Sequence, residues 1–360
     1  MPVGELKVDH QSKKHGTPLK LIVTGAAGFI GMHTALRLLA GGHEVVGIDN
    51  LNDYYDTRLK RDRLGILLGH AGFRFFLLDI ADEEAIAQRF AAERADRVIH
   101  LAAQPGVRYS IENPMAYVSS NLLGFASVLE ACRHSRIQHL IYASSSSVYG
   151  DNTRVPFSEH DPVDHPLSLY AASKRANELM AHAYAHLYAM PVTGLRFFTA
   201  YGPWGRPDMA PIVFARAICE GRTIQVFNHG NHQRDFTYVD DIVRGVAAVA
   251  MLEGAPSGQA VTAIEDPAVS TAPFRIYNIG NGTPVKLMDF LASLEDCLGK
   301  KARLELTAAQ PGDVRDTWAD CSDLERDFGY RPQTPLAEGM QQFVSWFKDY
   351  YPLRVKDPLP

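Results

Sequence analysis

Cysteine is scarce in this sequence, and its scarcity excludes two kinds of stabilising site. Only four cysteines occur among 360 residues, none of them in a Cys-x-x-Cys motif: Cys132, Cys219, Cys297 and Cys321. Neither a disulfide framework nor a cysteine zinc site is expected, and the scarcity fits a reducing cytoplasm. His182 and His186 are spaced like a metal-binding pair, but no third ligand accompanies them, so no metal site is predicted.

An excess of positive charge and a long apolar run are also missing. The 36 lysines and arginines are outnumbered by 41 aspartates and glutamates, which gives a net charge of −5. This balance argues against a nucleic-acid partner. No stretch of about 18 apolar residues is present to span a bilayer, and residues 1–18 lack the apolar segment of a signal peptide. We therefore expect no membrane partner, and we interpret residues 1–18 and 351–360 as tails.

What the sequence does contain is a regular alternation of short apolar runs and helical patterns. The apolar runs are Leu19–Thr24, Glu44–Asp49, Phe73–Asp79, Val98–Ala102 and His139–Ser144. The helical patterns are Phe29–Leu39, Arg58–Leu68, Asp82–Phe90, Pro114–Arg133 and Tyr170–Ala189. Such alternation predicts an α/β fold with a doubly wound parallel sheet of Rossmann type.

The amino-acid composition changes near Thr199, where proline and glycine become frequent and strand patterns become scattered. We predict one unit from residues 19–199, together with about 236–252, and a smaller mixed α/β unit from residues 200–235 and 253–350. The stretch Glu253–Pro273 is rich in alanine, proline and serine, and it is interpreted as a long surface loop. The smaller unit is expected to pack against the end of the sheet.

Glycines spaced three apart lie between the first predicted strand and the first helix. This spacing permits a tight turn, a close approach of backbone amides to a pyrophosphate, and close packing of the helix on the strand. The start of the helix adds a favourable partial positive charge. The turn therefore predicts a dinucleotide site, with contacts from Gly25, Ala27, Gly28, Phe29, Ile30 and Gly31.

The ends of the next strands indicate which dinucleotide is bound. Asp49, followed by Asn50, is placed to accept hydrogen bonds from an adenosine ribose, and its charge would repel the 2′-phosphate of NADP, so NAD is predicted. Asp79 and Ile80 are candidate adenine contacts, although a helix N-cap explains Asp79 nearly as well. The fourth strand ends in residues beside which a nicotinamide ribose can lie: Leu101, Ala102, Ala103 and Gln104.

A tyrosine and a lysine four residues apart are the candidate catalytic pair. On a helix this spacing places Tyr170 and Lys174 on one face, and the serine run Ser144–Ser147 ends the strand upstream. A tyrosine of pKa near 10 is a poor base at neutral pH. A neighbouring ammonium and a positively charged nicotinamide ring both favour its phenolate, and a serine orients the substrate hydroxyl. An exposed pair on a helix is the alternative interpretation.

A basic helix face at Arg58, Lys60, Arg61 and Arg63 is interpreted as solvated.

With these residues the chain resembles the extended short-chain dehydrogenase/reductase superfamily, in its sugar-nucleotide epimerase/dehydratase group. Within that group it is most similar to the UDP-glucuronate 4-epimerases, through the motifs Gln104–Ser110, Arg196–Thr199, Gly202–Met209, Arg234–Asp241 and Gln310–Asp313. The resemblance implies tightly held NAD, a UDP-glucuronate or UDP-galacturonate substrate, and oxidation at C4 followed by reduction on the opposite face. It also implies a homodimer formed through the helices Pro114–Arg133 and Tyr170–Ala189.

The resemblance also implies roles for single residues. Counting back from Val148-Tyr149-Gly150, Ser145 is the catalytic serine, with an uncertainty of one residue within the serine run. Asn121 matches an asparagine close to the active site and cofactor. Arg234 matches an arginine near the UDP diphosphate, with a salt bridge between units as the alternative. Phe227 is placed near the uracil, with a core position as the favoured alternative.

A C6 carboxylate next to a C4 ketone is prone to lose carbon dioxide, so an epimerase must hold that carboxylate in place. Arg206 is the candidate for this grip, because a guanidinium binds a carboxylate with two parallel hydrogen bonds. Hydroxyl donors are expected from Ser146, Ser147 and Thr199. The alternative is that Arg206 only pairs with Asp208.

Rival functions for the whole protein are another UDP-sugar 4-epimerase, a UDP-glucuronate decarboxylase, and an inactive NAD-binding sensor.

Overall fold

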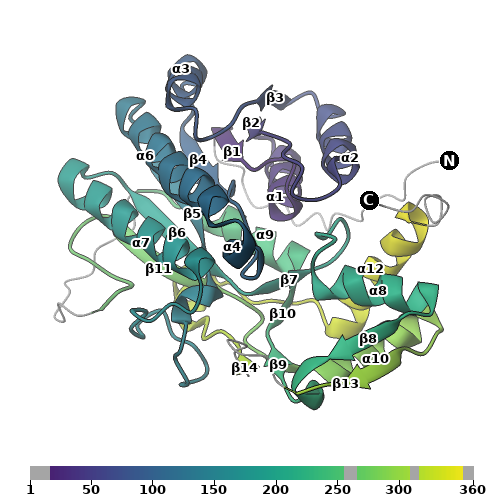
Figure 1. Ribbon diagram of the computed structural model, residues 1–360. Coiled ribbons are helices and arrows are strands. Elements are labelled where there is room, and N and C mark those ends of the chain that lie inside the picture. Colours follow the sequence, from purple (N-terminus) through teal and green to yellow (C-terminus); the bar gives the residue numbers. More distant parts are fainter. Residues whose placement is uncertain (1–16, 255–265, 309–315, 352–360) are drawn as a thin grey trace.

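Seven parallel strands form the central sheet of the protein (Figure 1). The computed structural model describes residues 17–254, 266–308 and 316–351. The strand order is β3-β2-β1-β4-β5-β6-β11. Their bounds are β1 (Lys20–Thr24), β2 (Glu44–Asp49), β3 (Phe73–Leu77), β4 (Arg97–His100), β5 (His139–Ser145), β6 (Val192–Phe197) and β11 (Phe274–Ile279). The inner strands are nearly continuous apolar runs, because helices cover both faces of the sheet.

Helices cover the two faces of this sheet in two groups (Figure 1). One face carries α1 (Phe29–Ala40), α2 (Thr57–Leu68) and α9 (Val239–Ala250), and α9 packs directly on α1. The other face carries α3 (Glu83–Glu93), α6 (Gly124–His134) and α7 (Leu169–Tyr188). The predicted doubly wound α/β fold is confirmed.

The predicted helix Pro114–Arg133 is interrupted. It consists of α5 (Pro114–Tyr117), a π-helical segment η1 (Val118–Leu123) and then α6, and it is preceded by a single turn, α4 (Tyr109–Glu112). The wide turn of η1 holds Asn121 in a buried position. Single π turns inside α-helices are frequent beside functional sites.

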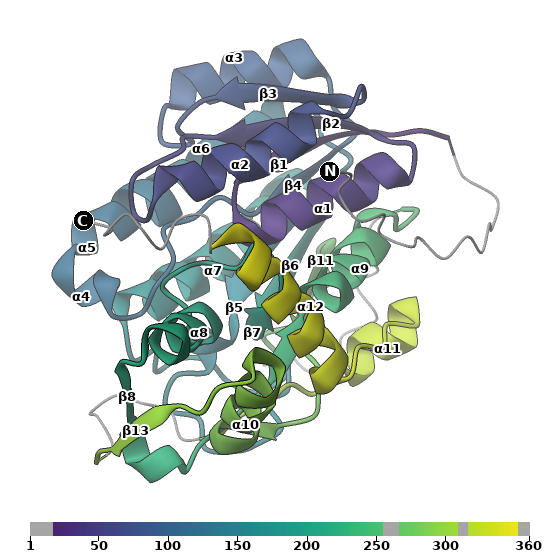
Figure 2. The same ribbon diagram turned by 90° about the vertical axis from the view of Figure 1, so that its right-hand side faces the viewer.

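The smaller unit is built from short strands and three main helices, which gather below α1 in Figure 2. The helices are α8 (Ala210–Glu220), α10 (Leu287–Leu298) and α12 (Leu336–Tyr350), with the shorter α11 (Ser322–Phe328) beside β11. The strands are β7 (Thr199–Tyr201) with β10 (Phe236–Tyr238), β8 (Thr223–Val226) with β13 (Arg303–Leu306), and β9 (Gln233–Arg234) between β12 (Val285–Lys286) and β14 (Asp316–Thr317).

The chain returns to the central sheet from within its second half. The strand β11 lies in the range 253–350, which we expected to belong to the smaller unit, yet it forms the seventh strand of the central sheet. One buried apolar cluster runs from Leu21 of β1 through Val246 of α9 to Phe290 of α10 and Phe343 of α12. The two units therefore share a core. The proposed tails (apart from residues 17, 18 and 351), residues 255–265 of the proposed loop, and the Gln310–Asp313 motif lie outside the described residues.

No helix within the described ranges is both long and apolar enough to cross a membrane.

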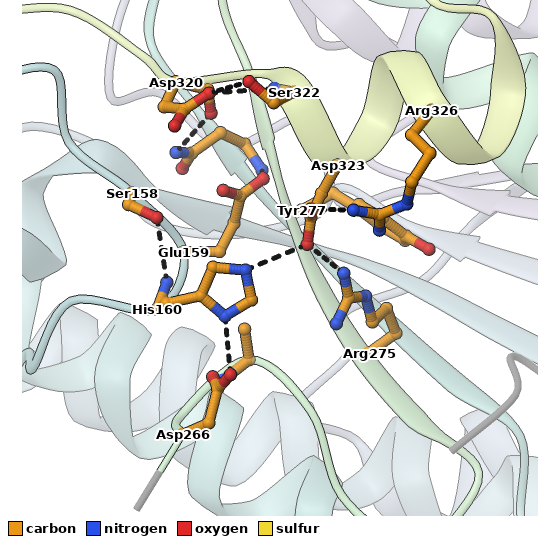
Figure 3. A network of polar contacts seen from close by, with 12 residues as sticks. Ser158, Glu159, His160, Asp266, Arg275, Tyr277, Asp320, Ser322, Asp323 and Arg326 are labelled. Carbon is orange, nitrogen blue, oxygen red and sulfur yellow. Dashed lines mark hydrogen bonds and ion pairs between the residues drawn. The ribbon is translucent and has the colours of Figure 1, made fainter. Parts of the chain in front are cut away.

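A charged cluster ties the segment after β5 to β11 and α11 (Figure 3). The imidazole of His160 lies between two carboxylates, with Nδ1 2.6 Å from Asp266 Oδ2 and Nε2 3.0 Å from Asp323 Oδ2. Arg275 of β11 and Arg326 of α11 also bind Asp323. The hydrogen bond to Asp323, reinforced by Asp266, raises the pKa of His160 to about 9. This cluster anchors an outer strand of the sheet to the chain that follows the serine run.

The cluster predicts a loss of stability on the alkaline side of neutrality. Because the pKa of His160 is raised in the folded state, protonated His160 stabilises the fold. This stabilisation is complete below the pKa of about 6.5 that histidine has in the unfolded chain, and it is lost as the pH rises toward about 9. The imidazole is 43% exposed, so solvent screening reduces that contribution to the order of 1 kcal/mol. We expect His160→Gln to lower the free energy of unfolding most at pH 6 and hardly at all at pH 10.

Urea unfolding across this pH range measures the difference, with exposed His165→Gln as the matched control. A penalty for His160→Gln that is the same at every pH would contradict the prediction.

Candidate functional site

A cavity of about 400 Å³ opens at the carboxyl ends of β1, β2, β4, β5 and β6. Ligands of doubly wound sheets bind at this edge, because the loops after the strands diverge there. Eighteen of the residues predicted to contact the cofactor or the substrate line the cavity. They are Gly25, Gly28, Phe29, Ile30, Gly31, Asp49, Asn50, Ile80, Leu101, Ala102, Ala103, Ser145, Ser146, Ser147, Tyr170, Lys174, Thr199 and Arg206.

The glycine turn has no room for side chains. Gly25 has a φ of +71°, and a Cβ there would lie 2.7 Å from the backbone nitrogen of Ala102. A Cβ on Gly31 would lie 2.0 Å from the carbonyl oxygen of Gly25. Helix α1 starts at this turn with Gly28 as its N-cap, and no side chain of the described residues caps it. Its first amides therefore suit an anion in the cavity.

The carboxylate of Asp49 lies beside this turn. Its Oδ2 accepts a hydrogen bond from the amide of Ala27 at 3.1 Å, and its Oδ1 accepts one from the amide of Leu51 at 2.8 Å. Ala27 thus acts through Asp49 and does not itself line the cavity. Burial raises the pKa of Asp49, and the nearby cation of Lys60 opposes that rise.

The expectation that Lys60 and Arg63 are solvated is wrong. Lys60 is 6% exposed and lines the cavity, and its Nζ donates to the side-chain and backbone oxygens of Asn52 at 2.6 and 2.8 Å. Arg63 is 0% exposed. Both lie in the helical period of Leu59, Leu64 and Leu67, the buried face of α2. That period is the signal in the sequence that separates them from exposed Arg61.

Asp79, Gln104 and Asn121 do not line the cavity but contact residues beside it. Asp79 accepts a hydrogen bond from the side chain of Asn50 at 2.9 Å. Asn121 is 2% exposed; its Oδ1 accepts from the amide of Gln104 at 2.8 Å, and its Nδ2 donates to Ser173 Oγ at 3.0 Å. Asn121 therefore joins η1 to the loop after β4 and to α7. These residues position the cavity wall and do not form it.

Phe227 and Arg234 lie away from this cavity. Phe227 is half-buried in a short 3-10 segment, with the guanidinium of Arg108 5.5 Å from its ring centre. Arg234 is half-buried on β9, and its Nη1 donates to the backbone oxygen of Gln233 at 3.0 Å. The roles expected for them toward uracil and diphosphate stay predictions.

The proposed catalytic residues converge from β5 and α7. Ser145 ends β5, is 7% exposed, and hydrogen-bonds with the phenol of Tyr170. Burial raises the pKa of Tyr170, while that hydrogen bond and the charge of Arg206 oppose the rise. Lys174 donates from Nζ to the carbonyl oxygen of Ala143 at 3.0 Å, and burial lowers its pKa to about 8. We expected its ammonium to lower the pKa of Tyr170, but within the protein alone burial outweighs the groups that favour the phenolate.

The neighbouring Ser144 is engaged elsewhere. Side chains alternate along a strand, so Ser144 and Ser145 point to opposite sides of β5. The hydroxyl of Ser144 donates to Glu178 Oε1 of α7 at 2.6 Å. Glu178 in turn pairs with Arg196 of β6, with Nε to Oε1 at 2.8 Å and Nη2 to Oε2 at 3.0 Å, and neither side chain is exposed. Ser144 therefore belongs to a buried network that holds α7 on the sheet.

Arg206 shows the pairing with Asp208 that was the alternative interpretation, while its expected contact with a sugar carboxylate stays a prediction. It lines the cavity, and it also forms a two-point ion pair with Asp208, with Nε to Oδ1 at 3.1 Å and Nη2 to Oδ2 at 2.7 Å. Tyr54, which also lines the cavity, donates from its hydroxyl to Asp208 Oδ2 at 3.1 Å. Tyr54 carried no signal in the sequence, because its partner lies 154 positions away.

The comparisons of this chain with known proteins agree on one family. The model of the NAD dependent epimerase/dehydratase family matches residues 21–265. UDP-glucuronate 4-epimerase 2 of Arabidopsis thaliana is 46% identical over 92% of this chain and 76% of its own length. The probable UDP-glucuronate 4-epimerase of Rhizobium meliloti is 44% identical over 92% and 98%. The crystal structure of UDP-glucuronic acid 4-epimerase from Bacillus cereus, in complex with UDP-glucuronic acid and NAD, has 32% identity, a TM-score of 0.81, and coverage of 92% and 100%.

Proposed function

Because this chain belongs to the NAD dependent epimerase/dehydratase family, we propose that it interconverts UDP-glucuronate and UDP-galacturonate. The reaction oxidises the sugar at C4, turns the ketone within the site, and reduces it on the opposite face. One observation carries the proposal: a single cavity holds a tyrosine–serine–lysine group for proton transfer together with a guanidinium able to bind a carboxylate.

The residues of the cavity fit NAD. The glycine turn is packed too closely for any Cβ, so it lines the cavity with backbone alone, and the uncapped start of α1 suits a pyrophosphate. Asp49 suits the hydroxyls of the adenosine ribose, and Leu101 to Ala103 leave a shallow wall for the other end of the cofactor. When bound, NAD supplies the hydride exchange at C4 and a positive charge near Tyr170.

The proton at C4 is handled by the group on β5 and α7. Tyr170 takes the proton of the C4 hydroxyl during oxidation and returns it during reduction. Ser145, already hydrogen-bonded with Tyr170, orients that hydroxyl. Lys174 with a pKa of about 8 carries a positive charge at neutral pH, and its bond to Ala143 fixes that charge at the end of β5.

The carboxylate at C6 is held by Arg206. A ketone at C4 makes the sugar a β-keto acid, which loses carbon dioxide when the bond from C5 to the carboxylate lies perpendicular to the carbonyl plane. A two-point guanidinium contact keeps the bond from C5 to the carboxylate away from that perpendicular orientation. Hydroxyls on the facing cavity wall, from Ser146, Ser147 and Thr199, supply further donors.

The faces of α4 to α7 support a homodimer. Large apolar side chains are exposed there on neighbouring elements: Ile111 (79%), Met115 (66%), Leu123 (51%), Leu179 (56%) and Leu187 (66%). Exposed apolar area of this kind marks an interface in soluble proteins. A second copy of the chain would cover it by packing the same helices against themselves about a twofold axis.

Incubation with UDP-glucuronate tests the proposed function. The purified protein is expected to produce UDP-galacturonate until the two sugars reach equilibrium. UDP-pentose as the main product would identify a decarboxylase, and turnover of UDP-glucose in preference to UDP-glucuronate would identify another 4-epimerase. No turnover of either sugar would contradict an enzymatic function.

Tyr170→Phe is expected to lower kcat by about 10²–10⁴-fold and to leave the amount of bound NAD unchanged, since only the transferable proton is removed. Tyr188→Phe, at an exposed position of the same helix, is the matched control. The assignment of the base is wrong if Tyr170→Phe keeps most of its turnover.

Arg206→Ala is expected to raise KM for UDP-glucuronate roughly ten- to hundredfold, which corresponds to the loss of a charged two-point hydrogen bond. It should also release more UDP-pentose per turnover, while the affinity for UDP-glucose changes little. Product analysis of both sugars measures these effects. Equal losses for the two sugars would show that Arg206 supports its loop and does not bind the carboxylate.

Light scattering at micromolar concentration is expected to give the mass of two chains. Leu179→Glu places a charge in the proposed interface and should shift the protein toward one chain. Leu68→Glu on α2, at a leucine of similar exposure on the opposite face of the sheet, should not. A monomeric wild-type protein would refute the proposed dimer.

A further inference from the structure

A fully buried arginine joins the cofactor turn to the loop that carries Arg206. Arg63 of α2 is 0% exposed, and each of its five N–H donors is bonded. Nε and Nη2 donate to the carbonyl oxygen of Trp204 at 3.1 and 2.5 Å, and Nη2 also donates to that of Gly205 at 3.1 Å. Nη1 donates to the carbonyl oxygen of Ala27 at 3.1 Å and to the hydroxyl of Tyr55 at 2.6 Å.

The acceptors of Arg63 are all neutral. In the part of the chain that the structure describes, no carboxylate forms an ion pair with it. Burying a cation that forms no direct ion pair is costly unless every donor is satisfied in a fixed geometry; here the carboxylate of Asp49 adds an attraction at longer range. The planar guanidinium therefore requires three separate segments to keep their relative positions. These are the glycine turn, the loop before α2, and the backbone at 204–205.

The backbone next to Arg206 is held from a second side as well. His33 of α1 lies with Nε2 3.0 Å from the carbonyl oxygen of Pro203. The carbonyl oxygens of three successive residues, 203 to 205, therefore contact side chains of α1 and α2. Trp204 adopts a φ of +62°, an unfavourable conformation for a residue with a side chain. Its ring packs against Trp346 and Tyr350 of α12, with ring centres 5.5 and 5.0 Å away.

The side chain of Arg206 emerges directly after this anchored backbone. It extends into the cavity, where Asp208 pairs with it and Tyr54 holds Asp208. Tyr54 precedes α2, the helix that carries Arg63. The backbone and the counter-ion of Arg206 are thus both positioned from α2 and the loop before it.

We propose that Arg63 is a positioning residue that sets the reach of Arg206 relative to the cofactor turn, and thereby controls whether the sugar carboxylate is retained during turnover. This inference rests on the proposed function. It assigns to a residue outside the cavity wall a specific effect on carboxylated sugars. A residue that only stabilises the fold would affect every UDP-sugar alike.

The test compares Arg63→Met and Arg63→Lys with wild type and with Arg61→Met, at an exposed position of the same helix. Calorimetry on the protein with its NAD bound measures the affinity for UDP-glucuronate and for UDP-glucose, which lacks the carboxylate. Gel filtration followed by absorbance measures how much NAD each variant keeps. Product analysis gives the ratio of UDP-pentose to UDP-galacturonate.

We expect Arg63→Met to lower the preference for UDP-glucuronate over UDP-glucose about tenfold, because a displacement of an ångström is enough to disrupt a two-point contact. The fraction of UDP-pentose should rise at least as much, and NAD content should stay within twofold of wild type. Arg63→Lys keeps the charge but lacks the planar fork, so it should show the same change to a smaller degree. If Arg63→Met does not fold, Arg63→Lys decides the question.

Two results would overturn the inference: an equal loss of affinity for both sugars, or a loss of NAD that accounts for the whole effect. Failure of the proposed function is visible separately, because it appears in the wild-type protein as an absence of preference for UDP-glucuronate.

Discussion

The site depends on one buried salt bridge, between Glu178 of α7 and Arg196 of β6. Neither side chain is exposed, and such a pair is stable only when its remaining polar atoms are also bonded. Here Glu178 accepts from Ser144 and Arg175, and Arg196 donates to Tyr149 and to the carbonyl oxygen of Glu159. Breaking a pair of this kind costs about 3–5 kcal/mol, so the helix cannot slide along the sheet.

This constraint determines where the proposed catalytic residues meet. The helix α7 carries Tyr170 and Lys174, and the strand β5 carries Ser145. Because the salt bridge network links α7 to β5 through Ser144, the serine and the tyrosine meet at one position along the strand. The same network includes the arginine of the Arg196–Thr199 motif, which holds α7 on the sheet and does not line the cavity.

Two further buried charges hold backbone segments in place. Arg63 binds carbonyl oxygens of the smaller unit, as described above. Asp235 is 0% exposed and accepts hydrogen bonds from the amides of Asn281, Gly282 and Ala319 and from the hydroxyl of Thr237. These charges use backbone groups as partners and so fix loops rather than single side chains. Arg63 in this way fixes the glycine turn and the backbone before Arg206, two segments beside the cavity.

The sequence by itself determined the local features of this protein. The doubly wound order follows from alternating periods, and the turn at Gly25 follows from glycine spacing. The cavity residues Asp49 and Tyr170 and the serine run 144–147 follow from their places at the ends of strands and at the start of a helix. Each of these depends on neighbours within a few residues. Only the tertiary structure decided which charges are buried and what they bind: Arg63 contacts a carbonyl 141 positions away, and Tyr54 a carboxylate 154 positions away. Spacing along the chain does not indicate such partners, because packing brings them together only after the strands and helices have formed.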